Sequence, residues 1–352
     1  MARVLCALVV SLAAVGAGAL AGRWADSFGE PARAAAGLVS AAAATAPPPL
    51  RIEIVPAPSP PAPALEAPRR TTLGETYRDG LVITGATPHR IILFTFDDGP
   101  DRRTTPVLLD RLDAAGVHAV FFLSCARLRG TIPAEREQIA IAQETARRGH
   151  IVASHTCDHI QLPILDDVGV RAQLTEAEDI FEKLFGGRPW LVRPPGGSRS
   201  PRIDHLIAAR GYTQVLWNLG AGDFQVRTAT DVYDTWRRVF ERRERDYGDR
   251  GGIVLLHDTY AWSVDAFQLI YDDLMAQNCR FLERGEELFD VLDDPGPFFV
   301  PRLGAPPGAV APGATLPPEW IAGRQARLRE ETAQRCRAIS ASPSGLPSTH
   351  GG

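Results

Sequence analysis

Two adjacent carboxylates, Asp97 and Asp98, close an apolar segment and stand directly before a Gly-Pro turn. The segment, residues 91–96, is β-branched and aromatic without polar alternation, which favours a strand buried on both faces of a parallel sheet. Carboxylates at the end of such a strand can transfer protons or bind a metal ion, although Asp also often caps helices and begins turns. The pair predicts chemistry if other strand ends supply partners.

A second group of residues with metal-binding side chains stands in the segment Ser-His-Thr-Cys-Asp-His, residues 154–159. Its histidines, His155 and His159, are four residues apart and would share a face if the segment formed a helical turn. Two histidines and a carboxylate make a metal site with open positions, and a pair of surface histidines is the alternative for an isolated match. A zinc peptidase fits less well, because Thr156 stands where that motif requires Glu.

Ionisable residues also follow three further apolar runs. Arg193, Asp223 and His257 each stand at or just past the end of one of these runs. A lone His is more often structural than catalytic, and Gly196 and Gly197 after the Arg fit a plain turn as well as a close approach to a ligand. Packing explains ionisable groups at so many strand ends poorly, so together they predict one site.

Short apolar runs alternate with helical patterns throughout the central part of the chain. The predicted strands occupy residues 91–96, 119–123, 151–153, 190–192, 214–217, 252–256 and 280–282. Helix signals separate them, among them Ser200-Pro201 at a start and Gly116 at an end. This alternation implies parallel pairing, in either a closed barrel or a doubly wound sheet. In both architectures, functional side chains gather at the carboxyl ends of the strands.

With these motifs in this order, the chain resembles the polysaccharide deacetylase family, the NodB-homology group of carbohydrate esterases. The resemblance covers roughly residues 91–292. It implies an α/β fold, a distorted (β/α) barrel with about seven parallel strands, and the predicted strand count agrees. It also implies a bound zinc ion, with another divalent transition metal as the alternative, and an N-acetylated glycan as substrate.

The resemblance assigns the metal site and the base to the first three motifs. Asp97 matches the family's catalytic base, and Asp98 matches a metal ligand. His155 and His159 match the other two ligands. Arg193 matches the residue that orients the base.

The remaining motifs imply the acid and the substrate pocket. His257 matches the catalytic acid, and Asp223 is expected to orient it. Pro195 and Gly196 are expected to line the substrate pocket, with the Gly196 N–H directed at the oxyanion, and Leu255 to lie near the acetyl methyl group.

Three positions depart from the family pattern. Gly196 stands where a Tyr is usual, which removes a stacking surface but keeps the backbone donor. Phe224 replaces a Trp, and Gly220 replaces an Asp often found upstream.

The composition predicts one folded domain between unstructured flanks. Residues 1–21 have the form of a signal peptide, with an uncleaved N-terminal anchor as the alternative. An Ala/Pro-rich disordered spacer follows at 22–70, then the deacetylase domain at 71–294. A Pro/Gly-rich tail occupies 295–352, with one short helix near 319–337, lying on the domain or hanging free.

These features predict export to the periplasm or the extracellular space, with the N-terminal anchor as the one contact with a membrane. A formal net charge of -4 gives no electrostatic case for binding nucleic acid. We expect the protein to be a monomer.

Four cysteines follow the predicted signal, which itself contains Cys6. An even number in an exported chain permits disulfides without fixing their pairing. Cys125 and Cys157 lie just past neighbouring predicted strands and could form one bridge, which leaves Cys279 to tie the tail through Cys336. Four free thiols are the alternative.

The sequence thus predicts a metal-dependent hydrolase that removes N-acetyl groups from an envelope or extracellular polysaccharide. Removal of O-acetyl groups or hydrolysis of another small amide is the nearest alternative, because activated water attacks either carbonyl. A non-catalytic glycan-binding envelope protein is the alternative from another class, and the intact set of acid, base and ligands argues against it.

Overall fold

The computed structural model describes residues 82–295, 299 and 318–341, all of which fall in one compact unit, Leu65–Gly352. The predicted signal or anchor, the spacer and most of the predicted tail lie outside the described residues, as does a second unit, Met1–Ala64. None of the described helices has the length and apolar character that crossing a bilayer requires.

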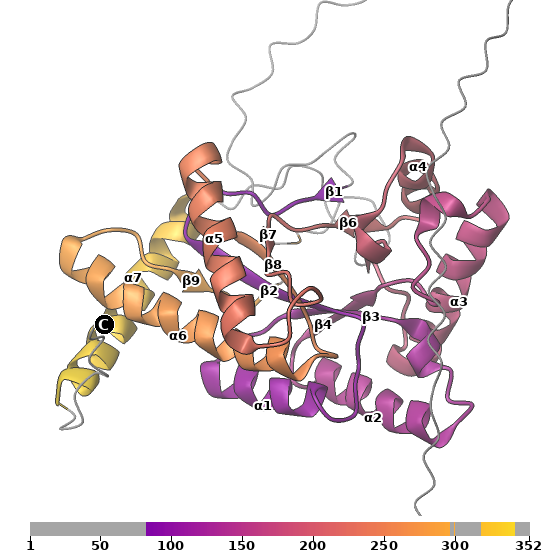
Figure 1. Ribbon diagram of the computed structural model, residues 1–352, viewed down its shortest axis with the longest axis horizontal. Coiled ribbons are helices and arrows are strands. Elements are labelled where there is room, and N and C mark those ends of the chain that lie inside the picture. The colour runs from indigo at the N-terminus through magenta and orange to yellow at the C-terminus, as the bar shows by residue number, and fades with distance from the viewer. Residues whose placement is uncertain (1–81, 296–298, 300–317, 342–352) are drawn as a thin grey trace, which may run out of the picture. The chain divides into compact units, whose positions relative to one another are not determined.

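The described chain forms a parallel sheet of nine strands (Figure 1). Its order is β1-β6-β5-β4-β3-β2-β8-β7, and β9 pairs with β2 beside this path. The strands are β1 (Val82–Ile83), β2 (Ile91–Asp97), β3 (Val120–Leu123), β4 (Ile151–Ser154), β5 (Leu191–Val192), β6 (Thr213–Val215), β7 (Leu219–Gly220), β8 (Gly252–His257) and β9 (Asp290–Val291). The predicted fold class, a distorted (β/α) barrel of parallel strands, is confirmed.

Helices alternate with the strands and pack on the outside of the sheet (Figure 1). They are α1 (Thr105–Ala115), α2 (Pro133–Arg147), α3 (Asp167–Phe185), α4 (Pro201–Ala209), α5 (Ala229–Tyr247), α6 (Ala261–Arg284) and α7 (Pro318–Ala341), with short 3₁₀ turns η1 (Cys125–Leu128), η2 (Leu162–Ile164) and η3 (Pro195–Gly197). Neighbouring helices contact one another in the order α5, α6, α1, α2, α3, α4. The predicted signals hold locally: Ser200 caps α4 through its side chain, and Gly116 ends α1 with a φ of 65°.

The predicted seventh strand at 280–282 is wrong, because these residues belong to α6. Phe281 continues the helical spacing of the buried residues Ile270 and Leu274, and α6 ends only at Gly285, whose φ is 70°. The last strand is β9, a few residues later. The two-residue strands β1 and β7 escaped prediction, because so short a segment carries no periodicity.

β2 explains how the fold can carry a polar site inside an apolar barrel. Its even-numbered apolar residues pack against the helices, whereas Ile91 and Leu93 pack with residues of neighbouring strands in a separate inner cluster. Alternate residues of a strand share a face, so Thr95 and Asp97 continue the inner face toward its carboxyl end. The interior therefore changes from apolar to polar at the edge where the sequence places the chemistry.

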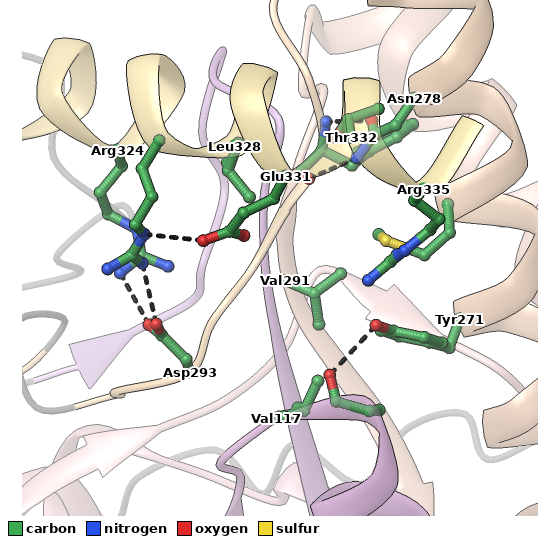
Figure 2. Close-up of a pocket in the computed structure, with 15 residues that line it drawn as sticks. Val117, Tyr271, Asn278, Val291, Asp293, Arg324, Leu328, Glu331, Thr332 and Arg335 are labelled. Atoms are coloured by element: carbon green, nitrogen blue, oxygen red, sulfur yellow. Dashed lines mark hydrogen bonds and ion pairs between the residues drawn. The ribbon is translucent and has the colours of Figure 1, made fainter. Parts of the chain in front are cut away.

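The helix predicted within the tail forms as α7, and it lies on the domain. Cys336 of α7 is bonded to Cys279 of α6, and Trp320 packs against the inner cluster. Figure 2 shows Arg324 of α7 reaching Asp293 beside a cavity of about 190 Å³ between α6, α7 and β9; the bond from Nη1 to Oδ1 is 2.7 Å long. The described part of the tail is thus attached to the domain by a covalent bond and by ion pairs.

Candidate active site

The carboxyl ends of the parallel strands bring the predicted residues to one edge of the sheet. Asp97 at the end of β2 is the register partner of His257 at the end of β8. Ser154 at the end of β4 is the partner of Val192, which stands directly before Arg193. Residues separated by up to 160 positions in the sequence are therefore neighbours because the strands end together.

The Arg193 guanidinium holds Asp97 inside the barrel. Its Nη1 donates to Asp97 Oδ1 at 2.6 Å and to Thr95 Oγ1 at 2.9 Å. Its Nε and Nη2 donate to the carbonyl oxygens of Val215 and Leu216 at 2.9 and 3.0 Å. The side chain is fully buried, and burial lowers the pKa of Arg193 while the Asp97 carboxylate opposes that change. Because Oδ1 of Asp97 is taken by Arg193, Oδ2 is the oxygen left for proton transfer.

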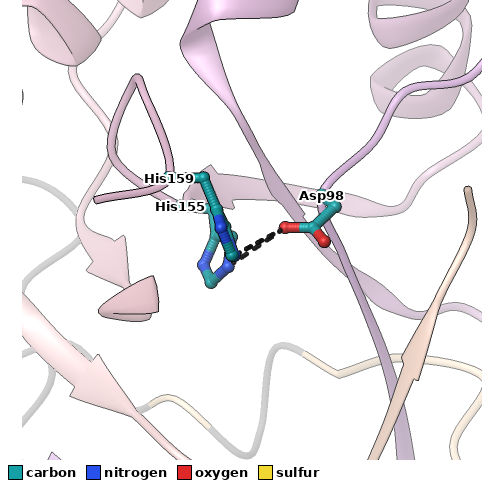
Figure 3. A group of neighbouring side chains, drawn as sticks. All are labelled: Asp98, His155 and His159. Atoms are coloured by element: carbon teal, nitrogen blue, oxygen red, sulfur yellow. Dashed lines mark ion pairs between the residues drawn. The ribbon is translucent and has the colours of Figure 1, made fainter. Parts of the chain in front are cut away.

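Asp98, His155 and His159 converge on a single point (Figure 3). The Nε2 atoms of His155 and His159 lie 3.4 and 3.2 Å from Asp98 Oδ1. The segment does not form the helical turn that would place both histidines on one face: Thr156 and His159 have φ values of 62° and 53°, in the left-handed region. An irregular loop with these backbone angles, rather than a helical repeat, therefore brings both imidazoles to one carboxylate.

The chemistry of the three side chains fits a divalent cation. His155 Nδ1 lies 2.8 Å from the Arg193 carbonyl oxygen, which can only accept, so Nδ1 carries the proton and Nε2 presents its lone pair. Asp98 Oδ1 is buried, and no described residue donates a hydrogen bond to it. Two imidazole nitrogens and one carboxylate oxygen are the kind of donor set found in catalytic zinc sites with open positions.

The pKa values at this cluster favour the protonation states that bind metal. Burial opposes ionisation of Asp98, but the interaction with His155 and the charges of His155, His159 and His257 outweigh it and lower its pKa to about 2. Burial also lowers the pKa of His159, as do the neighbouring histidines, against the opposing charge of Asp98. A carboxylate beside a neutral imidazole is what a cation requires.

His257 stands on the other side of the cluster, held by Asp223. Its Nδ1 lies 2.8 Å from Asp223 Oδ1, and its backbone N–H donates to Asp223 Oδ2 at 2.7 Å. Burial disfavours the charged imidazole, but the hydrogen bond and charge of Asp223, with smaller contributions from Asp97 and Asp98, raise the pKa of His257 to about 9. The Nε2 atom of His257, 3.9 Å from Asp98 Oδ2, therefore keeps a proton at neutral pH.

Five of the predicted site residues line one cavity of about 240 Å³, together with Gly196 and Leu255: Asp97, Asp98, His155, His159 and His257. Arg193 and Asp223 are buried and are not among the lining residues. Pro195 is buried and is not among the lining residues, so the structure does not bring this predicted substrate contact into the pocket. Trp217, Phe224 and Tyr260 complete the wall. These three aromatic residues all follow the ends of strands, which was the available signal for them.

Two glycines, Gly197 and Gly220, leave Trp217 room at the cavity. A β-carbon on Gly197 would lie 2.8 Å from the indole of Trp217, and one on Gly220 would lie 3.2 Å from its Nε1. Gly196 itself has a φ of 63°, which disfavours the side chain usual in related motifs. The two positions where glycine replaces the usual family residue, Gly196 and Gly220, thus occur together with an aromatic wall formed by Trp217, Phe224 and Tyr260.

A disulfide supports the histidine loop. Cys157, between the two predicted ligands, is bonded to Cys125 of η1, and the Cys125 N–H donates to the Thr156 carbonyl oxygen at 3.0 Å. This bridge is the one hypothesised from neighbouring strands, and Cys279–Cys336 is the pairing that this left; four free thiols do not occur in the structure. The loop that presents His155 and His159 is therefore attached to a neighbouring element by both a covalent bond and hydrogen bonds.

Sequence comparison supports the same family. Residues 84–215 match the family model described as polysaccharide deacetylase. The chain is 30% identical over 185 residues to a chitin deacetylase of Pestalotiopsis sp, covering 53% of this chain and 59% of the relative. It is 32% identical over 193 residues to the peptidoglycan-N-acetylmuramic acid deacetylase PdaC of Bacillus subtilis (strain 168), covering 55% of this chain and 38% of the relative. The chain therefore spans about four to six tenths of the length of these two relatives.

A solved structure agrees with the fold. The chitin deacetylase from the fungal pathogen Colletotrichum lindemuthianum superposes with a TM-score of 0.50 at 25% identity, covering 56% of this chain and 87% of that one. The residues matched by the family model include β2, β4 and β5, whereas Asp223 and His257 lie beyond them. Residues 84–215 are thus similar in sequence to the polysaccharide deacetylase family, and the fold agrees with that of a solved chitin deacetylase.

Proposed function

We propose that this protein is a metal-dependent hydrolase that removes N-acetyl groups from an envelope or extracellular polysaccharide. One observation carries the proposal: Asp97, held by Arg193, and His257, held by Asp223, line the same cavity as Asp98 and its two histidines. A proton acceptor on one side of a metal-ligand set and a proton donor on the other are what amide hydrolysis needs. The relatives are named for chitin and peptidoglycan, both of which carry acetamido groups.

Zinc is the cation we propose for Asp98, His155 and His159, with another divalent transition metal as the alternative. A cation bound by these residues would polarise the acetamido carbonyl and make water a stronger acid. The donor set explains why Asp98 Oδ1 is buried without a hydrogen-bond donor among the described residues.

The side chains of this chain then divide the proton transfers. Asp97, fixed through Oδ1 by Arg193, accepts a proton from the attacking water at Oδ2. As the C–N bond breaks, His257 gives the proton on Nε2 to the departing nitrogen, since an unprotonated amide nitrogen is a poor leaving group. The products are acetate and a free amine on the glycan. The exposed Gly196 places backbone at the cavity, where its N–H is proposed to stabilise the oxyanion.

The glycan is proposed to contact the aromatic wall of the cavity. Phe224 is 51% exposed and lies beside His257, and Tyr260 stacks on Trp262 with 4.9 Å between ring centroids. Sugar rings present C–H faces that pack on such surfaces. Leu255 lines the same cavity and is proposed to contact the acetyl methyl group.

We further propose that residues 71–294 form the catalytic domain of an exported protein. In this proposal residues 1–21 are the signal peptide or anchor, 22–70 a spacer and 295–352 a tail. The protein would act as a monomer in the periplasm or outside the cell.

The test is release of acetate from purified protein supplied with zinc. We expect acetate from N-acetylated chitooligosaccharides or peptidoglycan fragments, less from O-acetylated glycans, and none after chelation. Exclusive activity on O-acetyl groups would select the esterase alternative. Binding of glycan with no acetate from any substrate would instead favour a non-catalytic glycan-binding protein.

A further inference from the structure

Asp258 is a buried carboxyl group that the proposed proton transfers do not use. It follows His257 directly and is fully buried. Its Oδ2 accepts a hydrogen bond from Thr105 Oγ1 at 2.5 Å, whereas Oδ1 has no hydrogen-bond partner among the described residues. Burial raises the pKa of Asp258 to about 7, against the opposing hydrogen bond from Thr105. Burying a carboxyl oxygen without a hydrogen bond lowers the stability of the fold, so we expect this side chain to contribute to something other than stability.

The carboxyl group packs directly on the backbone of Gly99. A β-carbon on Gly99 would lie 2.1 Å from Asp258 Oδ2 and 2.3 Å from Oδ1, although the φ of Gly99 lies outside the left-handed region. Only the absence of a side chain therefore lets the two approach. Gly99 directly follows Asp98, which has a φ of 73°, an unfavourable conformation for a residue other than glycine. Such a conformation persists only where its surroundings hold it in place.

Further hydrogen bonds hold the same turn. Thr104 Oγ1 donates to the Asp258 carbonyl oxygen at 2.5 Å, and Thr105 Oγ1 accepts from the Asp101 N–H at 2.7 Å. On the opposite side, the Ser124 N–H donates to the Gly99 carbonyl oxygen at 3.1 Å. The turn after Asp98 is thus held on one side by Asp258 and on the other by Ser124, the residue that follows β3.

We propose that Asp258 is a positioning residue for the metal site, which holds the Gly99 backbone so that Asp98 faces His155 and His159. The inference rests on the proposed function, because it assigns Asp98 to a cation. It depends on the size of the Asp258 side chain and on its hydrogen bond with Thr105. Ligand-orienting residues outside the coordination set typically change metal affinity about 10- to 100-fold when removed.

The test is the zinc affinity of the metal-free protein, measured by calorimetry or competition with a chelating dye. Asp258→Ala is expected to weaken zinc binding about 10- to 100-fold. Asp258→Asn, which keeps the size and an acceptor for Thr105, is expected to stay within about threefold of wild type, because shape rather than charge holds the turn. Thr105→Val is nearly isosteric and removes the hydrogen bond, so it is expected to fall between the two.

Asp290→Asn is the matched control for a buried carboxyl group. Asp290 is 1% exposed and accepts a bond from Arg324, but it pairs with Ile91 at the amino end of β2, opposite the metal site. Its replacement is expected to lower stability and leave zinc affinity unchanged. If Asp290→Asn weakened zinc binding as much as Asp258→Ala, a general loss of stability would explain both, and the inference would fail.

A double-mutant cycle tests the contact itself. Gly99→Ala places a methyl group against the carboxyl group of Asp258 and is expected to weaken zinc binding in wild type, but to cost much less in Asp258→Ala, where the carboxyl group is gone. Additive losses would contradict a direct contact. Wild-type protein that binds no zinc would overturn the proposed function together with the inference. Wild-type affinity in folded Asp258→Ala would overturn the inference alone.

Discussion

The carbonyl oxygen of Arg193 lies 2.8 Å from Nδ1 of His155, so the residue that holds the proposed base also fixes the tautomer of a proposed metal ligand. The guanidinium of the same residue reaches Asp97 at 2.6 Å. Side chain and backbone of Arg193 thus serve different partners. Substitution can separate them, because it changes the side chain and leaves the carbonyl in place.

Replacing Arg193 should therefore damage the base more than the metal site. Arg193→Lys keeps the charge but cannot replace the guanidinium contacts to Asp97, Thr95 and the two strand carbonyls. We expect kcat for acetate release to fall about 100-fold or more, with zinc affinity within a fewfold of wild type.

Arg210→Lys is the matched control for this substitution. Arg210 forms a bidentate ion pair with the buried Glu178, between α4 and α3, away from the cavity. It should lower stability without changing kcat. Equal loss of activity in both variants would contradict the orienting role of Arg193.

Asp223 should set the alkaline limit of activity. The pKa of His257 is raised to about 9, so the proton that His257 must donate is retained below that pH and lost above it. Asp223→Asn removes the neighbouring charge, and the pKa should fall, which moves the alkaline limb of the kcat/KM profile down by about one to two pH units. The measurement is the pH profile of acetate release from folded protein. An unchanged limb would show that another group titrates there.

His150 should make the protein less stable in acid. Burial lowers its pKa from 6.5 to about 4, helped by the charge of His118, and its Nδ1 accepts the Ala119 N–H, which requires the neutral ring. Between these two values the unfolded chain binds the proton and the folded chain does not. Stability therefore falls as pH drops through that window, by about 3 kcal/mol in total.

The urea unfolding free energy at about pH 7 and about pH 4.5 measures this effect. His150→Asn keeps an acceptor for Ala119 and does not titrate, so its stability should depend less on pH. His205→Asn offers a control on α4, outside the sheet. If wild type and His150→Asn lost equal stability in acid, other groups would be responsible.

The two disulfides should differ in their consequences. Cys279 and Cys336 close a loop of 57 residues, so their joint replacement by Ser should cost about 4 kcal/mol of stability and spare zinc affinity. Joint replacement of Cys125 and Cys157 should also weaken zinc binding, because Cys157 lies between the two histidine ligands. Urea unfolding and zinc titration of both double variants separate these effects. If both double variants bound zinc with the same affinity, the Cys125–Cys157 bridge would not be needed to hold the loop that carries His155 and His159.

The sequence predicted the strands that carry the site, because their apolar runs lead into ionisable residues. Asp97 and His257 could be assigned to one edge from the strand order alone, and they are register partners. The strand predicted at 280–282 failed because Phe281 belongs to α6, which continues to Arg284. A short apolar run has no period long enough to separate the two structures.

The geometry of the loop that carries His155 and His159 could not be predicted, because it depends on positive φ values at residues other than glycine. Neither Thr nor His is a residue type that predicts a positive φ, as found at Thr156 and His159. The aromatic wall was missed for a different reason: its residues follow strand ends, but the room for Trp217 at the cavity depends on Gly197 and Gly220, which lack side chains next to it. Such effects arise from packing between distant segments, which local patterns do not record.

The most direct test of the central claim compares Asp97→Asn with Asp98→Asn for zinc content and acetate release in the same preparation. Asp97 contacts Arg193, whereas Asp98 contacts both histidines, so the adjacent residues should fail by different routes. Asp97→Asn should bind zinc as wild type does and release almost no acetate, and Asp98→Asn should bind zinc at least 10-fold more weakly. Full activity in Asp97→Asn, or unchanged zinc affinity in Asp98→Asn, would contradict the assignment of base and ligand.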